Sequence, residues 1–63
     1  MPIIHVNLLE GRPKEKVAEV IEKITKTVSE TLDAPVESIR VLVTEIPQTH
    51  WGRAGKSVSE NNH

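Results

Sequence analysis

Residues 2–9 of the chain read Pro-Ile-Ile-His-Val-Asn-Leu-Leu. Ile4, Val6 and Leu8 are apolar, whereas the residues between them are mixed. The content of β-branched residues is high. Alternation with period two in residues of this type is typical of a β-strand. We therefore expect a strand here, with one fully apolar face and one mixed face.

A helix is expected to follow this strand. Pro13 suits the first helical position, where its missing N–H costs nothing. The apolar residues beyond it recur along one helical face, a pattern that predicts a helix of about five turns: Val17, Val20, Ile21, Ile24, Val28 and Leu32. Glu19 with Lys23, and Glu22 with Lys26, are spaced to form supporting ion pairs. The helix is expected to end at 33–35, Asp-Ala-Pro, because the residue before a proline avoids helical geometry.

A second strand is expected over residues 38–46, Ser-Ile-Arg-Val-Leu-Val-Thr-Glu-Ile, which Pro47 closes. Strand, helix and strand in this order form a β-α-β unit with parallel strands. Gly52 and Gly55 predict a turn in the tail, and with it a small hairpin that reaches another subunit. The predicted fold class is therefore α+β, with a single domain over 1–63, a C-terminal hairpin and a polar, mobile tail at about 58–63.

The chain needs stabilisation from outside its own core. It has 63 residues and no cysteine, and chains below about 70–80 residues usually rely on disulfides, a metal or partner subunits. The histidines, His5, His50 and His63, lack the spacing of zinc ligands, so no metal is expected. Two strands and one helix cannot close a core. We therefore expect neighbouring copies to complete the sheet.

Charge and hydropathy limit the possible partners. Eight basic and nine acidic residues give a net charge of −1, which provides no basic surface for nucleic acid. No apolar run approaches the length of a membrane span, and the N-terminus lacks the features of a signal peptide. A cytoplasmic protein that binds neither nucleic acid nor membrane is expected.

The start of the chain carries the most unusual chemistry. Met1 is followed by Pro2, and an initiator methionine in this context is normally removed. The mature chain would then begin with a prolyl amine held by its ring at the start of a strand. Apolar walls or nearby arginines favour the neutral form of such an amine, which suits it to act as a general base near neutral pH. Phosphate-binding loops and nucleophile elbows are absent from the sequence.

The chain resembles the 4-oxalocrotonate tautomerases over nearly its whole length. The resemblance rests on motifs that occur in the same order in both: Pro2, Leu9-Glu10-Gly11-Arg12, Leu32-Asp33-Ala34-Pro35, Ile39-Arg40-Val41, Thr44-Glu45 and His50-Trp51-Gly52. It implies a β-α-β fold and a homohexamer built as a trimer of dimers. It also implies cofactor-free keto–enol tautomerisation of unsaturated oxo-dicarboxylates such as 2-hydroxymuconate.

The same resemblance implies roles for five residues. Pro2 would be the catalytic amine that moves a proton from the enol oxygen to carbon. Arg12 would bind the distal carboxylate, and Arg40 of a neighbouring subunit would bind the 2-oxygen and the carboxylate beside it. The backbone amide of Leu9 and the ring of Trp51, where the family usually has phenylalanine, would bind substrate. A planar, always charged guanidinium suits such carboxylate recognition.

Two other functions remain open. One is a non-catalytic oligomeric module that keeps the fold without the chemistry. The other is a hydratase or dehalogenase, which the sequence disfavours, because the related dehalogenases carry an extra arginine at the position of Leu9 and a glutamate at that of Arg53.

Some candidate side chains also have alternative roles that need no substrate. Arg40 could form an ion pair with Glu37 or Glu45, and Trp51 could pack in a subunit interface. His5 and His50 are expected to bond to backbone or solvent. Arg53 could add positive potential that steers dianionic substrates.

Overall fold

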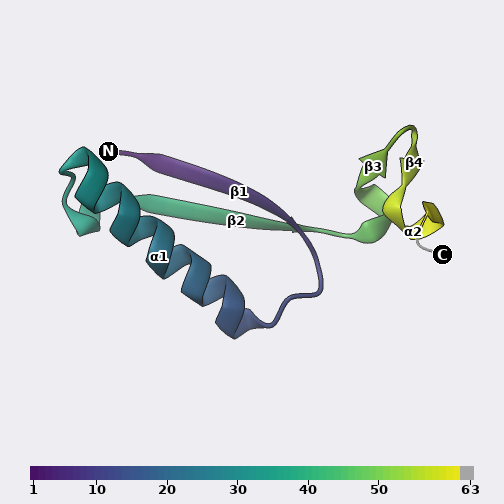
Figure 1. Cartoon of the computed structure of the whole chain (residues 1–63), viewed down its shortest axis with the longest axis horizontal. Helices are drawn as coiled ribbons and strands as arrows, with labels where there is room; N and C mark the ends of the chain where they lie inside the picture. Colours follow the sequence, from purple (N-terminus) through teal and green to yellow (C-terminus); the bar gives the residue numbers. More distant parts are fainter. Residues whose placement is uncertain (62–63) are drawn as a thin grey trace.

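The computed structural model describes residues 1–61 and confirms a β-α-β unit followed by a C-terminal hairpin. Figure 1 shows the elements in chain order. The elements are strand β1 (Ile3–Leu9), helix α1 (Lys14–Leu32), a 3₁₀ turn (Val36–Ser38), strand β2 (Arg40–Ile46), a second 3₁₀ turn (Gln48–His50), strands β3 (Gly52–Arg53) and β4 (Lys56–Ser57), and helix α2 (Val58–Asn61).

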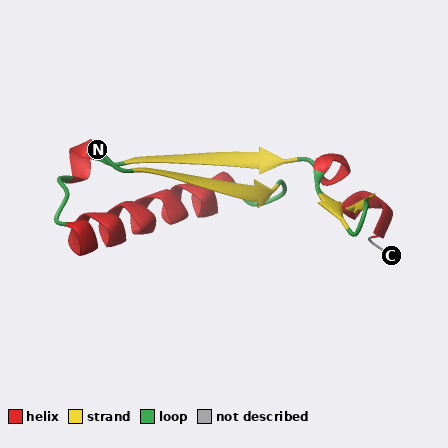
Figure 2. Ribbon diagram, turned by 90° about the horizontal axis from the view of Figure 1, so that it is seen from above, coloured by secondary structure: helices red, strands yellow, loops and turns green. Residues whose placement is uncertain are grey.

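Strands β1 and β2 form a two-stranded parallel sheet. Ile3 lies beside Arg40 at one end, and Leu9 lies beside Ile46 at the other. Helix α1 covers one face of this sheet, and the other face is open (Figure 2). Burial alternates along both strands as the period-two pattern predicts, with the half-buried residues Ile4, Val6, Leu8, Val41 and Val43. The covered face is therefore aliphatic.

Local capping residues set the two ends of α1. Pro13 is the N-cap, in an extended conformation (φ −61°, ψ 148°), and its carbonyl accepts hydrogen bonds from the backbone N–H groups of Lys16 and Val17. The prediction that Pro13 is the first helical residue is therefore wrong by one position. The helix ends at Leu32, and the C-cap Asp33 adopts a left-handed conformation (φ 54°, ψ 40°). The backbone N–H groups of Asp33 and Ala34 both donate to the carbonyl of Ser29. Such a left-handed residue is a common helix terminator.

The second strand begins two residues later than predicted. Residues 36–38 form a 3₁₀ turn, in which Ser38 Oγ donates to the carbonyl of Pro35 at 2.8 Å and the N–H of Ile39 donates to the carbonyl of Val36 at 3.2 Å. These local bonds hold the backbone out of the strand until Arg40. Ile39 is the only residue among 1–59 that is fully buried, with 6% of its surface exposed.

The predicted tail hairpin is confirmed as β3 and β4, which pair antiparallel. Ala54 (φ 54°) and Gly55 (φ 84°) both lie in the left-handed region, as a two-residue type I′ turn requires. The polar segment at 58–63, predicted to be mobile, begins with the helical turn α2, which the sequence did not predict. The mobility remains a prediction, and residues 62–63 lie outside the described part of the chain.

Replacement of Ala54 by glycine should stabilise the protein by about 0.5–1 kcal/mol. The left-handed conformation costs an L-residue about 1–2 kcal/mol, and the larger conformational entropy of glycine in the unfolded chain removes part of that gain. Urea unfolding of both proteins at equal concentration measures the difference. Gly52→Ala is the matched control, because Gly52 has no positive φ and a Cβ there would meet nothing within 4 Å. Lower stability of Ala54→Gly would contradict the backbone argument.

The single chain is more extended, and exposes more surface, than a compact monomer of its length. Its radius of gyration is 14.8 Å, whereas a compact chain of this length has a value of about 11 Å. It exposes 5004 Å² of surface, whereas about 4,000 Å² is typical of a monomer of this mass. Large apolar side chains remain exposed on both faces of the unit, among them Ile3, Val20, Leu32, Val36 and Leu42.

Within residues 1–61, no helix combines the length and the apolar character that crossing a bilayer requires.

Candidate active site

Four of the five candidate site residues lie at the two ends of the β1–β2 sheet, and the fifth, Trp51, lies beyond it. Pro2 and Arg40 lie where the two strands begin, and the backbone N–H of Arg40 donates to the carbonyl of Pro2 at 3.0 Å. Leu9 and Arg12 lie where β1 ends. Seven strand residues separate the two ends by about 20 Å. One chain therefore brings Pro2 to Arg40 but not to Arg12.

Pro2 is half-buried, and Met1 before it is 84% exposed. With Met1 attached, the Pro2 nitrogen belongs to a peptide bond and has no basic lone pair. Removal of Met1 would convert it to a secondary amine at the end of a strand, where the ring and the hydrogen bond to Arg40 limit its motion. The high exposure of Met1 leaves it accessible to an aminopeptidase.

The Arg40 side chain turns towards the 3₁₀ turn that precedes β2. Its Nη1 donates to the carbonyls of Glu37 at 2.6 Å and Ile39 at 3.3 Å. No ion pair joins it to a carboxylate in the described part of the chain, so the predicted alternative of an ion pair with Glu37 or Glu45 is not formed there. A guanidinium has five N–H donors. The exposed head group of Arg40 therefore keeps donors for a carboxylate or an enol oxygen.

Arg12 is held near the end of β1 by a turn at Gly11. Gly11 has a φ of +120°, which side-chain-bearing residues rarely adopt. This turn brings Arg12 back towards the strand, so that its Nη1 donates to the carbonyl of Leu9 at 3.3 Å. Leu9 and Arg12 therefore form one local unit at the end of β1.

Trp51 belongs to a segment that extends beyond the sheet. We call residues 47–61 the C-terminal arm; Figure 1 shows it standing clear of β1, β2 and α1. Trp51 is half-buried, and its carbonyl accepts a hydrogen bond from the N–H of Val58 at 2.8 Å. The backbone of Trp51 is therefore held within the arm, at the opposite end of the molecule from Pro2.

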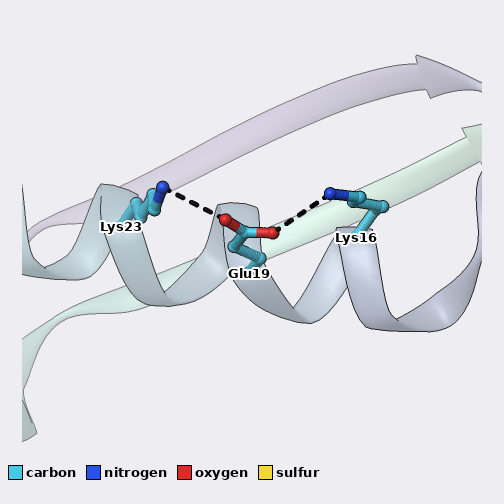
Figure 3. A network of polar contacts seen from close by, with 3 residues as sticks. All are labelled: Lys16, Glu19 and Lys23. Carbon is cyan, nitrogen blue, oxygen red and sulfur yellow. Dashed lines mark ion pairs between the residues drawn. The ribbon is translucent and has the colours of Figure 1, made fainter.

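A groove of about 460 Å³ lies along α1 beside the end of β1. Its floor is apolar, and its rim carries charges; it is lined by Leu8, Arg12, Lys16, Val17, Glu19, Val20, Lys23 and Ile24. Glu19 bridges Lys16 at 3.6 Å and Lys23 at 3.1 Å (Figure 3), which confirms the predicted Glu19–Lys23 pair. The predicted Glu22–Lys26 pair is not formed among the described residues. Of the candidate site residues only Arg12 lines this groove, so the groove is not an assembled catalytic pocket.

Both described histidines bond to threonine hydroxyls, so the expectation that they bond to backbone or solvent is wrong. His5 Nε2 lies 2.8 Å from Thr44 Oγ1 across the open face of the sheet. His50 Nδ1 lies 2.8 Å from the hydroxyl of Thr49, its neighbour in the chain. Across residues 1–61, no three His, Asp or Glu side chains gather where they could hold a metal ion.

Comparison with known proteins decides the family. A family model described as "Tautomerase enzyme" matches residues 2–61. The chain belongs to the tautomerase family. The tautomerase is 42% identical over 57 residues to a 2-hydroxymuconate tautomerase from Stutzerimonas stutzeri, with 90% of each chain covered. It is 40% identical over 62 residues to a 2-hydroxymuconate tautomerase from Pseudomonas putida, with 98% of each chain covered.

Solved structures agree with this assignment. The tautomerase superimposes with a TM-score of 0.93 and 46% identity on TomN, a 4-oxalocrotonate tautomerase homologue of a tomaymycin biosynthetic pathway, with 97% of this chain and 94% of TomN covered. The TM-score is 0.89 and the identity 32% for a heterohexameric 4-oxalocrotonate tautomerase from Chloroflexus aurantiacus, with 95% and 97% of the two chains covered. The predicted resemblance is confirmed, and the chain is an enzyme of the isomerase class.

Proposed function

We propose that this tautomerase converts dienols such as 2-hydroxymuconate to their conjugated ketones without a cofactor, with the Pro2 amine as base and then acid. The observation that carries this proposal is the pairing of Pro2 with Arg40 at the start of the parallel sheet. That pairing would place a neutral amine and a permanent cation at the same end of the molecule. The 2-hydroxymuconate tautomerases among the relatives support the choice of substrate.

The proposed reaction moves one proton within the substrate. The Pro2 amine takes the proton from the 2-hydroxyl oxygen, the resulting negative charge spreads over the dienolate, and the protonated amine returns the proton to carbon. Hydrogen-bond donors aimed at the charged oxygen lower the energy of that intermediate. In this proposal Arg40 of the same chain would supply these donors, whereas the resemblance implies that a neighbouring subunit supplies them. Arg12 would bind the distal carboxylate and draw electron density along the conjugated chain.

A complete site would need more than one copy of the chain. Leu9, Arg12 and Trp51 lie far from the Pro2 of their own chain, so other subunits would supply them. We propose a homohexamer built as a trimer of dimers, with each mature chain starting at Pro2, in the cytoplasm. The extended shape of the single chain supports an assembly of this kind, as does the hexameric state of the Chloroflexus aurantiacus neighbour.

The test is the rate of 2-hydroxymuconate ketonisation, followed by absorbance, on protein whose N-terminus is verified by intact mass. Saturable turnover is expected from protein that lacks Met1. Arg12→Gln and Arg40→Gln should each lower kcat/KM by about 10–100-fold, because each loses a charged hydrogen bond of about 1.5–3 kcal/mol.

Lys26→Gln is the control for these two arginine variants. It removes one exposed positive charge from the side of α1 opposite the apolar stripe and should leave the rate unchanged. Full activity of both arginine variants would contradict the assigned roles. No turnover by Met1-free protein would indicate a different substrate, and haloacrylate turnover at a comparable rate would favour the dehalogenase.

A further inference from the structure

Two positive charges face each other at the tip of the C-terminal arm. Arg53 of β3 is registered directly opposite Lys56 of β4, and both residues are exposed. Neither forms an ion pair within the described residues. Like charges directly opposite each other destabilise an antiparallel pair. A bound anion would remove this repulsion.

Trp51 lies on the same side of the hairpin as Arg53. The hydrogen bond from Val58 N–H to the Trp51 carbonyl extends the β3–β4 pairing by one step, and Trp51 has extended backbone angles (φ −106°, ψ 104°). Along extended backbone, side chains two positions apart point to the same face, with their Cα atoms about 7 Å apart. Gly52 between them has no side chain. The side chains of Trp51 and Arg53 therefore lie on the same face of the arm, so an arm that contributes the indole to a pocket also contributes the guanidinium.

We propose that Arg53 is a specificity-determining residue that binds a second carboxylate of the substrate, with Lys56 adding positive potential. The inference rests on the proposed function, because it places Arg53 in the pocket to which Trp51 is assigned. The indole would contact the apolar conjugated chain, and the guanidinium would bind the carboxylate at its end. A carboxylate offers about four lone-pair sites and can accept from Arg53 in addition to Arg12. The arm would thereby select dicarboxylates over monocarboxylates.

Paired substrates test this selection. 2-Hydroxymuconate carries two carboxylates, whereas 2-hydroxypenta-2,4-dienoate carries one and keeps the dienol. Arg53→Gln should lower kcat/KM about tenfold or more for the dicarboxylate, chiefly through KM, and by less than about twofold for the monocarboxylate. Arg53→Lys should retain part of the preference, because it keeps the charge and loses the planar fork. Lys26→Gln, which removes an equal charge elsewhere, should change neither rate.

A binding measurement makes the test independent of catalysis. Trp51 is the only tryptophan of the chain, so quenching of its fluorescence reports binding beside it. Muconate and sorbate are a matched dicarboxylate and monocarboxylate that lack the reactive hydroxyl. Arg53→Gln should weaken muconate binding about tenfold and leave sorbate binding unchanged.

The outcomes distinguish this inference from the proposed function. Selective muconate binding that depends on Arg53, in a protein that ketonises neither dienol, would support the inference and refute the proposed reaction. Normal ketonisation with equal effects of Arg53→Gln on both substrates would refute the inference alone. Equal losses accompanied by a change in oligomer mass, measured by light scattering, would assign Arg53 to a contact between copies and would also refute it.

Discussion

Protein that retains Met1 should ketonise 2-hydroxymuconate about 10²–10⁴ times more slowly than the same protein freed of Met1, which is the contribution expected of a positioned general base. The reason is electronic, because the Pro2 nitrogen is an amide in one form and a secondary amine in the other. The two forms differ by one exposed residue that lies outside β1. A difference in rate between them therefore reports the amine and not the fold.

The experiment uses one preparation in two states. Protein expressed under inhibition of methionine aminopeptidase is assayed, treated with that enzyme, and assayed again, with intact mass recorded each time. The rate should rise in proportion to the fraction that begins at Pro2. Pro2→Ala, which keeps an N-terminal amine but loses the ring, should also be slower, because the amine is then free to rotate. Equal rates for all these proteins would exclude Pro2 as the base.

Leu42→Asp should dissociate the proposed assembly and unfold the chain. Leu42 is 52% exposed on the open face of the sheet, directly beside His5. In an isolated chain such a change would usually cost no more than about 0.5 kcal/mol. Under a neighbouring copy, the new carboxylate would be buried without a partner, at a cost of about 3–5 kcal/mol. Because Ile39 is the only buried residue among 1–59, the single chain has little core to offset that cost.

Light scattering and circular dichroism measure this second effect. Leu42→Asp should lose both the oligomer and the helical signal, together with all activity. The matched control is Lys26→Asp, which places the same carboxylate on the solvent side of α1 and should keep mass, structure and activity. A folded, active Leu42→Asp protein would show that the open face of the sheet is not covered in solution.

Local patterns predicted the elements of the fold well. Three patterns predicted β1, α1 and the β3–β4 hairpin: the alternation over residues 3–9, the apolar stripe from Val17 to Leu32 and the glycines of the hairpin. Each pattern depends on neighbouring residues alone. The errors lie where local hydrogen bonds compete with the pattern. Ser38 bonds back to Pro35 and delays β2, and Pro13 caps the helix from outside it.

The sequence predicted which residues belong to the candidate site, but not how they are arranged in space. Pro2, Arg12 and Arg40 were identified through the family resemblance, because no periodicity marks a catalytic amine or a substrate-binding arginine. Their mutual distances could not be predicted from the sequence. The contacts His5–Thr44 and Arg53–Lys56 were likewise not predicted, since each depends on how two strands align.

The sequence by itself determined the family and most of the secondary structure, because periodicity and motif order are properties of the linear chain. The need for partner copies, argued from the short length and the lack of cysteine, stays a prediction. Only the tertiary structure decided that Pro2 meets Arg40 at one end of the sheet while Leu9 and Arg12 lie at the other, and that the arm carries Trp51 away from both. The physical reason is that strand register and turn geometry, which no single segment contains, set the distances between segments.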